Sequence, residues 1–145
     1  MRLGVNFGRP RLAEDARVFA ETIIALANVV VAENRAFLRE VGAPELYKSG
    51  VRYQNDNVGQ RGQYDCLDDI PTILDRGWGD CLHLSCWRVA ELLERRQRAS
   101  VAVEFPDSSH PDALRIFHVV VRRSFGFECP STLLGMAPWQ PPQSP

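Results

Sequence analysis

The feature that most constrains the fold is the stretch 12–41, which has the periodicity of an amphipathic helix. Its apolar residues recur mostly at steps of three and four, so one face of a helix carries them. They are Leu12, Ala16, Phe19, Ala20, Ile23, Ile24, Ala27, Val30, Val31, Phe37, Leu38 and Val41. Gly42 and Pro44 then end the pattern. The pattern predicts one helix of about eight turns, or two helices with a bend near Asn34.

A second amphipathic pattern begins at Cys81 and continues to about residue 96, with Asp80 as its N-cap. Its apolar face is expected at Leu82, Cys86, Val89, Ala90 and Leu93. A shorter helix is predicted over 68–74. The residues before it, 50–69, are polar and rich in turn formers, which predicts a long loop holding a short strand near 51–53.

Three runs rich in β-branched and aromatic residues follow the second helix, at 100–105, 115–123 and 125–129. An order of helix, loop, helix and then adjacent strands favours an α+β fold, with the helices packed on a small antiparallel sheet. The chain has 145 residues, the size of one domain. We therefore expect a single domain over 1–135 and a flexible, proline-rich tail over 136–145.

Composition excludes several classes of partner. The net charge of −1 offers no strong field for nucleic acid or an anionic membrane surface. No apolar run reaches the ~18 residues of a membrane span, and the first ten residues lack the apolar segment of a secretory signal. We expect a cytoplasmic protein whose four cysteines are reduced, with no nucleic-acid or membrane partner and no cofactor.

The residue best placed for chemistry is Cys81, at the first turn of the second predicted helix. The unpaired N–H groups and the positive dipole end there favour an anion, so we expect a thiol pKa lowered from about 8.5 toward neutrality. Gly77 and Gly79 let the chain turn sharply and let a substrate backbone approach. The N–H groups of the first turn are also expected to form an oxyanion hole.

A thiol nucleophile needs a base, and the chain has three histidines. His83 lies two residues after Cys81 on the same helix and points about 200° away from it. His110 falls in a polar loop segment. His118 lies in an apolar strand pattern, either as the base for Cys81 or as a core histidine bonded to a backbone carbonyl. The residues alone leave these two roles of His118 open.

Gly79-Asp80-Cys81 thus opens an amphipathic helix, and His118 follows in the strand Phe117-His118-Val119-Val120-Val121. With Pro130-Ser131 after the last strand, this arrangement resembles the transglutaminase-like branch of the papain-type cysteine hydrolases. The stretch from about 47 to 136 also resembles small transglutaminase-like proteins of tailed bacteriophages and prophages. The segments that carry this likeness are 46–53, 70–72, 76–81, 87–92 and 130–136.

The resemblance implies a papain-like core over about 47–135 and a cysteine-dependent amide hydrolase, either a peptidase or an amidase. Cys81 would attack the carbonyl of a peptide or glutamine-like amide, and His118 would carry the proton. Hydrolysis is expected rather than transamidation, because a small domain offers little to exclude water. The expected partner is a peptide or protein substrate.

The chain departs from the family at the third catalytic position. The family has an aspartate before Pro-Ser, and this position is Cys129 here, with Glu128 as the adjacent carboxylate. Neighbouring strand residues face opposite ways, so Glu128 does not simply replace the aspartate. Loss of the orienting carboxylate costs about 10⁴ in rate in one triad. The alternative is therefore a weak or inactive module, such as a phage assembly or virion component with a phage structural protein as its partner.

Further candidates lie around the cysteine. Gln63 or Tyr64 would bind the oxyanion or the substrate from the preceding loop, and Trp78 would wall the cleft; ordinary surface and packing roles are the alternatives. Zinc is disfavoured because the cysteines lack knuckle spacing. A disulfide between Cys81 and Cys129 is disfavoured because an imidazole would lie between the two sulfurs.

Overall fold

The computed structural model describes residues 2–5, 13–55, 65–105 and 117–137. Within them the chain forms four α-helices and small sheets of two and three strands, which confirms the mixed α+β class. In chain order the elements are β1 (Arg2–Val5), α1 (Ala13–Glu40), the 3₁₀ helix η1 (Leu46–Lys48), β2 (Arg52–Tyr53), β3 (Asp65–Asp68), α2 (Ile70–Arg76), β4 (Trp78–Gly79), α3 (Cys81–Glu94), β5 (Ala99–Glu104), β6 (His118–Arg123), β7 (Gly126–Glu128) and α4 (Pro130–Leu133).

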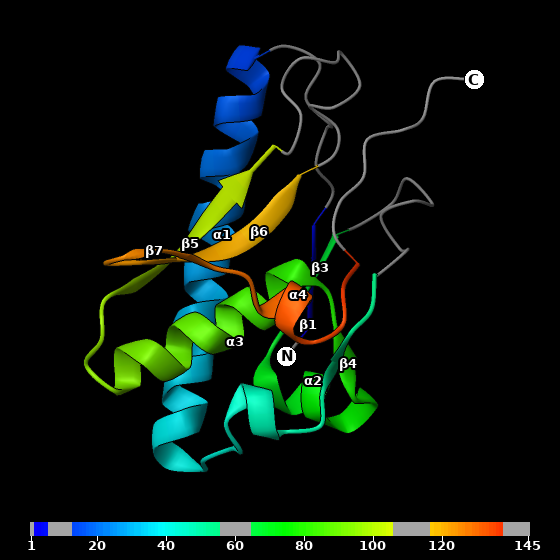
Figure 1. Cartoon of the computed structure of the whole chain (residues 1–145), viewed down its shortest axis with the longest axis vertical. Coiled ribbons are helices and arrows are strands. Elements are labelled where there is room, and N and C mark those ends of the chain that lie inside the picture. The colour runs from blue at the N-terminus through cyan, green and yellow to red at the C-terminus, as the bar shows by residue number, and fades with distance from the viewer. Residues whose placement is uncertain (1, 6–12, 56–64, 106–116, 138–145) are drawn as a thin grey trace.

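The first amphipathic pattern forms one helix rather than two. Figure 1 shows α1 along the longest axis of the molecule. Asn34, where a bend was considered, lies within the helix and is fully buried. Its Oδ1 accepts a hydrogen bond of 3.0 Å from the Ile70 N–H at the start of α2. The helix ends as predicted at Gly42, which has a φ of 86° and donates its N–H to the Phe37 carbonyl.

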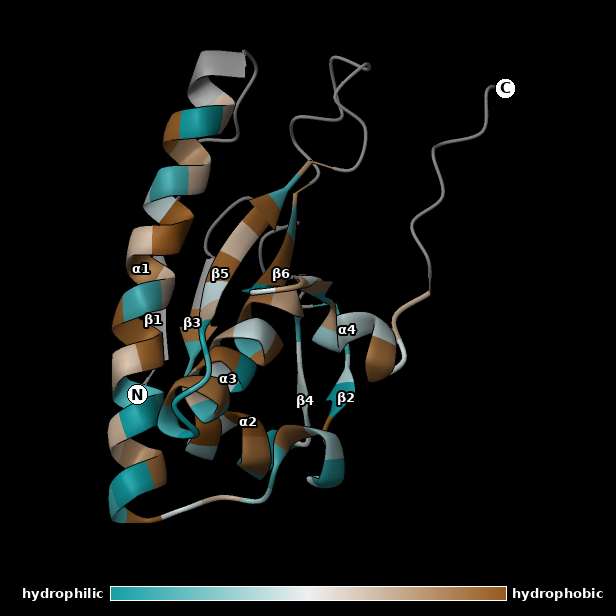
Figure 2. Ribbon diagram, turned by 60° about the vertical axis from the view of Figure 1, so that its left-hand side comes forward, coloured by the Kyte–Doolittle hydropathy of each residue, from teal (hydrophilic) through white to brown (hydrophobic). Residues whose placement is uncertain are grey.

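The main core lies between α1, α3 and a three-stranded sheet. The sheet is antiparallel in the order β5-β6-β7, as predicted. Figure 2 shows β5 and β6 as largely apolar strands beside α1. Alternate residues of the strands enter the core, which α1 and α3 complete with their apolar faces. Its central side chains are Ile23, Ala27, Val30, Leu82, Cys86, Val89, Ala90, Val101, Val119 and Val121.

A second feature is a parallel pair of two-residue strands, β2 and β4. β2 confirms the short strand predicted near 51–53, whereas β4 and the pairing were not predicted. Arg52 pairs with Trp78, and Tyr53 pairs with Gly79. On its other side, β2 is bonded to the segment after α4, since the Tyr53 N–H donates to the Leu134 carbonyl at 3.0 Å. β2 therefore joins the residues just before α3 to the residues just after α4.

The predicted loop 50–69 contains β2 and β3, and β3 pairs antiparallel with β1. Residues 56–64 of this loop lie outside the described residues, as do residues 138–145 of the predicted tail. No helix in the described part of the chain is both long enough and apolar enough to cross a membrane.

Candidate functional site

The start of α3 carries the N-cap that the sequence predicted. The Asp80 side chain accepts hydrogen bonds from the Leu82 N–H at 3.0 Å and from the His83 N–H at 3.1 Å. The imidazole of His83 completes a capping box, because its Nδ1 accepts the Asp80 N–H at 3.2 Å. His83 is buried and also lies 3.1 Å from an Arg76 nitrogen. It therefore belongs to the cap of the helix, on a face that Cys81 does not share.

This cap overturns two expectations for Cys81. The pKa of the thiol is raised to about 12, first by burial and then by the negative charge of Asp80. Hydrogen bonds from the Val119 and Leu82 backbone amides only partly offset these effects. The expected lowering was wrong, because burial disfavours the charged thiolate and the carboxylate that caps the helix also repels it. The Leu82 and His83 N–H groups, expected in an oxyanion hole, already donate to Asp80.

His118 begins β6, the strand on which α3 packs. Ser85 on α3 donates its hydroxyl to the Val119 carbonyl at 3.1 Å, which fixes the helix against this strand. The Nε2 of His118 lies 3.1 Å from the Sγ of Cys129, within hydrogen-bonding distance. Among the hydrogen bonds of the described residues, none links Cys81 to His118. The structure thus brings the imidazole to Cys129 and leaves Cys81 beside Val119, the next residue of the same strand.

Cys129 lies between β7 and α4 and is partly exposed. Its sulfur also lies 3.2 Å from the Thr132 Oγ1. Burial opposes ionisation, but the hydrogen bonds from His118 and Thr132 outweigh it and lower the pKa of the Cys129 thiol to about 7. Sequence reasoning missed Thr132. Pro130 was the available signal, because a proline in the first turn of a helix turns residue 132 back over residue 129.

Tyr53 is a second residue that sequence reasoning missed. Its phenol is half-buried on β2. Burial raises its pKa to about 12, with smaller contributions from the charges of Cys81, Asp80 and Cys129. The phenol therefore stays protonated, and its pKa is affected by the charges of both sulfurs. No local signal marked this residue, since its position depends on the pairing of β2 with β4.

Glu128, the adjacent carboxylate considered as a substitute for the aspartate, has other partners. It accepts from the Arg88 Nε at 2.6 Å, from the Arg123 Nη1 at 2.6 Å and from the Tyr47 hydroxyl at 2.5 Å. Burial opposes its ionisation, but these donors hold the pKa of the carboxyl below its usual value. The carboxylate thus joins β7 to α3 and η1, and the expected alternation along the strand directs it away from His118.

The remaining candidates lie around this centre or outside the described residues. Trp78 is partly buried, with the Arg76 guanidinium 4.0 Å above its ring and the Arg76 Nε donating to its carbonyl at 2.7 Å. Gln63 and Tyr64 lie outside the described residues. Cys86 is buried in the core, with its sulfur 3.8 Å from the Ala27 carbonyl oxygen.

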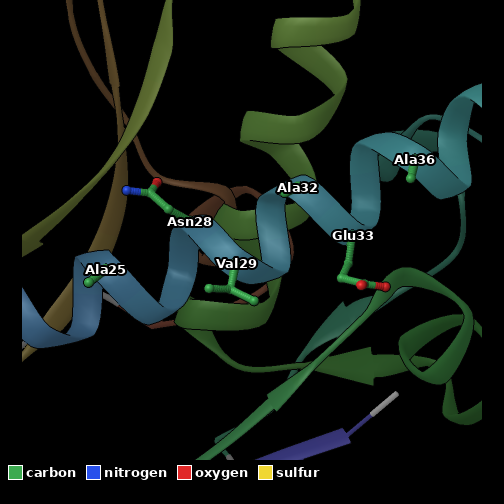
Figure 3. Close-up of a pocket in the computed structure, with 6 residues that line it drawn as sticks. All are labelled: Ala25, Asn28, Val29, Ala32, Glu33 and Ala36. Atoms are coloured by element: carbon green, nitrogen blue, oxygen red, sulfur yellow. The ribbon is translucent and has the colours of Figure 1, made fainter.

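An open hollow of about 490 Å³ lies elsewhere, along one face of α1. Figure 3 shows the side chains that line it, which are Ala25, Asn28, Val29, Ala32, Glu33 and Ala36. None of them is a nucleophile or an imidazole. Within the described ranges, no group of three or more histidine, cysteine, aspartate and glutamate side chains is arranged to hold a metal ion.

The site thus combines three titratable groups, which are carried by three parts of the fold. They are a thiol of raised pKa at the head of α3, an imidazole at the start of β6 and a thiol of lowered pKa before α4. These are the groups that thiol-based nucleophilic chemistry uses.

Comparisons with protein-family models, with curated proteins and with solved structures gave no match to the chain.

Proposed function

We propose that the protein is a cysteine-dependent amide hydrolase in which Cys81 is the nucleophile, His118 the base and Cys129 the third member. The observation that carries the proposal is the distance of 3.1 Å between the His118 Nε2 and the Cys129 Sγ. A thiolate at this position accepts a hydrogen bond from Nε2–H, so the proton of the neutral imidazole stays on Nε2 and Nδ1 is unprotonated. This is the tautomer that a general base needs.

The raised pKa of Cys81 determines how such a reaction would proceed. The thiol is neutral at rest, so His118 must take its proton while the sulfur attacks the amide carbon. The same proton then passes to the leaving amine as the C–N bond breaks, and a thioester remains on Cys81. Water, deprotonated by His118, hydrolyses this thioester and restores the thiol. The hydrogen bond between a nucleophile such as Cys81 and its base often forms only once substrate is bound.

The arrangement of elements supports a transglutaminase-like, papain-type core. A helix begins with the nucleophile, the adjacent strand begins with the imidazole, and the third member follows the next strand. Ser85 holds the helix and the strand together next to the two reacting residues. Peptide or glutamine-like amides are the proposed substrate class. Hydrolysis is favoured over transamidation because a domain of this size offers little to exclude water.

The test is turnover of a panel of fluorogenic peptidyl and glutaminyl coumarin amides. We expect Cys81→Ala and His118→Gln to lower hydrolysis at least 100-fold, as expected for loss of a nucleophile or a general base. Cys86→Ala, on the same helix but in the core, is the matched control and should retain activity. Circular dichroism of each variant separates loss of chemistry from loss of folding. Hydrolysis that survives Cys81→Ala in a folded variant would refute the assignment.

A second candidate function is a catalytically inactive module, such as a phage assembly or virion component that binds a phage structural protein. The observation that favours it is the cap of α3, because Asp80 disfavours a thiolate at Cys81 and occupies the first-turn N–H groups. This candidate predicts that the folded wild type cleaves none of the substrates.

A further inference from the structure

The cysteines differ sharply in their surroundings, which bears on a chemistry other than amide hydrolysis. Cys86 is 1% exposed and lies in the core. Cys81 is partly exposed, but its only hydrogen-bonding groups are backbone amides. Among the three cysteines whose side chains are described, Cys129 alone combines partial exposure with polar side chains on its sulfur.

The surroundings of Cys129 are built by separate elements. The His118 Nε2 approaches the sulfur from β6 at 3.1 Å, and the Thr132 Oγ1 approaches it from α4 at 3.2 Å. An imidazole N–H donor and a hydroxyl donor both favour a thiolate over a thiol.

The other charged and titratable groups nearby do not cancel this effect. On α3, Cys81 stays protonated at neutral pH, and on β2 the phenol of Tyr53 does so as well. Asp80 is the anion at the head of α3, and Glu104 of β5 is the cross-strand neighbour of His118 in the sheet register. Of the described side chains, only those of His118 and Thr132 lie within hydrogen-bonding distance of the Cys129 sulfur.

We propose that Cys129 is a site of thiol–disulfide exchange, at which the thiolate held by His118 and Thr132 captures low-molecular-weight disulfides. Its sulfur attacks one sulfur of the disulfide, the S–S bond breaks, and a small thiolate leaves and takes a proton from the solvent. The product is a mixed disulfide on Cys129, so the protein sulfur is oxidised and the small thiol is the reduced product. This activity goes beyond the proposed hydrolysis and does not depend on it.

The expected rate of exchange at Cys129 follows from the fraction of the thiol that is ionised. A thiol of pKa about 7 has roughly 30 times more thiolate at pH 6 than a thiol of pKa about 8.5. The lower intrinsic nucleophilicity of the more acidic thiolate reduces this advantage roughly fivefold. We therefore expect Cys129 to exchange about six times faster at pH 6 than an ordinary exposed thiol.

The experiment uses the full chain and 4,4′-dithiodipyridine, with released thiopyridone followed by absorbance across pH 5 to pH 9.5 and the modified peptide identified by mass spectrometry. The expected result is a fast phase of one thiol per chain, with a midpoint near pH 7, that maps to Cys129. Cys129→Ser should remove this phase, and Cys81→Ser should leave it. A fast phase on another cysteine, or a midpoint near 8.5, would overturn the proposal.

A matched pair of variants tests the geometry. Thr132→Val keeps the shape of the side chain but removes the hydroxyl, so the midpoint should rise by about one pH unit, the size expected for a lost hydrogen bond to a charged group. Thr132→Ser keeps the hydroxyl and should keep the midpoint. Equal midpoints in both folded variants would refute the role of Thr132. The profile of the wild type is a sufficient test if the valine variant fails to fold, and it is informative whether or not the protein hydrolyses amides.

Discussion

Replacing Glu128 by glutamine is expected to destabilise the fold substantially. The carboxylate accepts hydrogen bonds from Arg88, Arg123 and Tyr47, and so connects β7 to α3, to the neighbouring strand β6 and to η1. Glutamine has almost the same shape, but it removes the charge and turns one acceptor oxygen into an NH₂ donor. That donor would face an arginine or tyrosine donor, and two guanidinium groups would lose their counter-charge.

The expected loss of stability follows from how deeply Glu128 and its two arginine partners are buried. Removing one partner of a fully buried ion pair costs about 3–5 kcal/mol. Here the Glu128, Arg88 and Arg123 side chains are 15%, 14% and 12% exposed, so solvent screens part of the loss. We expect a decrease of about 2–4 kcal/mol in the free energy of unfolding. At about 3 °C per kcal/mol for a chain of this size, the Tm should fall by about 6–12 °C.

Urea denaturation followed by circular dichroism, together with calorimetry, measures both quantities. The control is Glu45→Gln, which removes exposed contacts with Lys48 and Arg95 and should leave the free energy of unfolding nearly unchanged. A loss below about 1 kcal/mol in Glu128→Gln would refute the network as a structural element. A shift in the titration of Cys129 in this variant would show that Glu128 acts on the imidazole instead.

Two further predictions concern the same fold. Gly79→Ala should destabilise the protein by about 1–3 kcal/mol in urea, because an added Cβ would lie 3.1 Å from the His83 Cβ and 3.3 Å from a Leu84 methyl carbon. The pKa of Glu128 is lowered in the folded state, so its contribution is present above the unfolded-state pKa and is lost as pH falls through the folded-state pKa. Urea midpoints between pH 7 and pH 3 should therefore decline more steeply in the wild type than in Glu128→Gln, and parallel slopes would contradict this.

The elements that the sequence predicted well are those that carry their own periodicity. The helices α1 and α3 and the strands β5, β6 and β7 begin and end within a few residues of the expected positions. A short strand was expected near β2, but β4 and the pairing of the two strands were not. Each strand has two residues, too few for a period, and the paired residues are 26 positions apart in the chain (52 with 78, and 53 with 79). Such pairings depend on tertiary packing, which no local pattern encodes.

The candidate site was predictable in part for the same reason. The residue pattern marked Cys81 and His118 and predicted Asp80 as an N-cap, whereas Cys129 was marked only by the family resemblance. The consequence of that cap for the thiol was missed, because whether the dipole or the neighbouring carboxylate prevails depends on how deeply the sulfur is buried. Tyr53 joins the site only through the pairing of β2 with β4, so no spacing in the sequence indicated it.

The position of β2 has a consequence for local opening of the protein. The Arg52 and Gln54 amides bond to the segment before Cys81, at the Gly77 and Gly79 carbonyls, whereas the Tyr53 amide bonds to Leu134, beyond Cys129. Hydrogen exchange at these three consecutive amides therefore reports on both walls of the site at once. Common, slow exchange would mean that the two thiols separate only in a cooperative opening, and unequal exchange would mean that each wall fluctuates by itself.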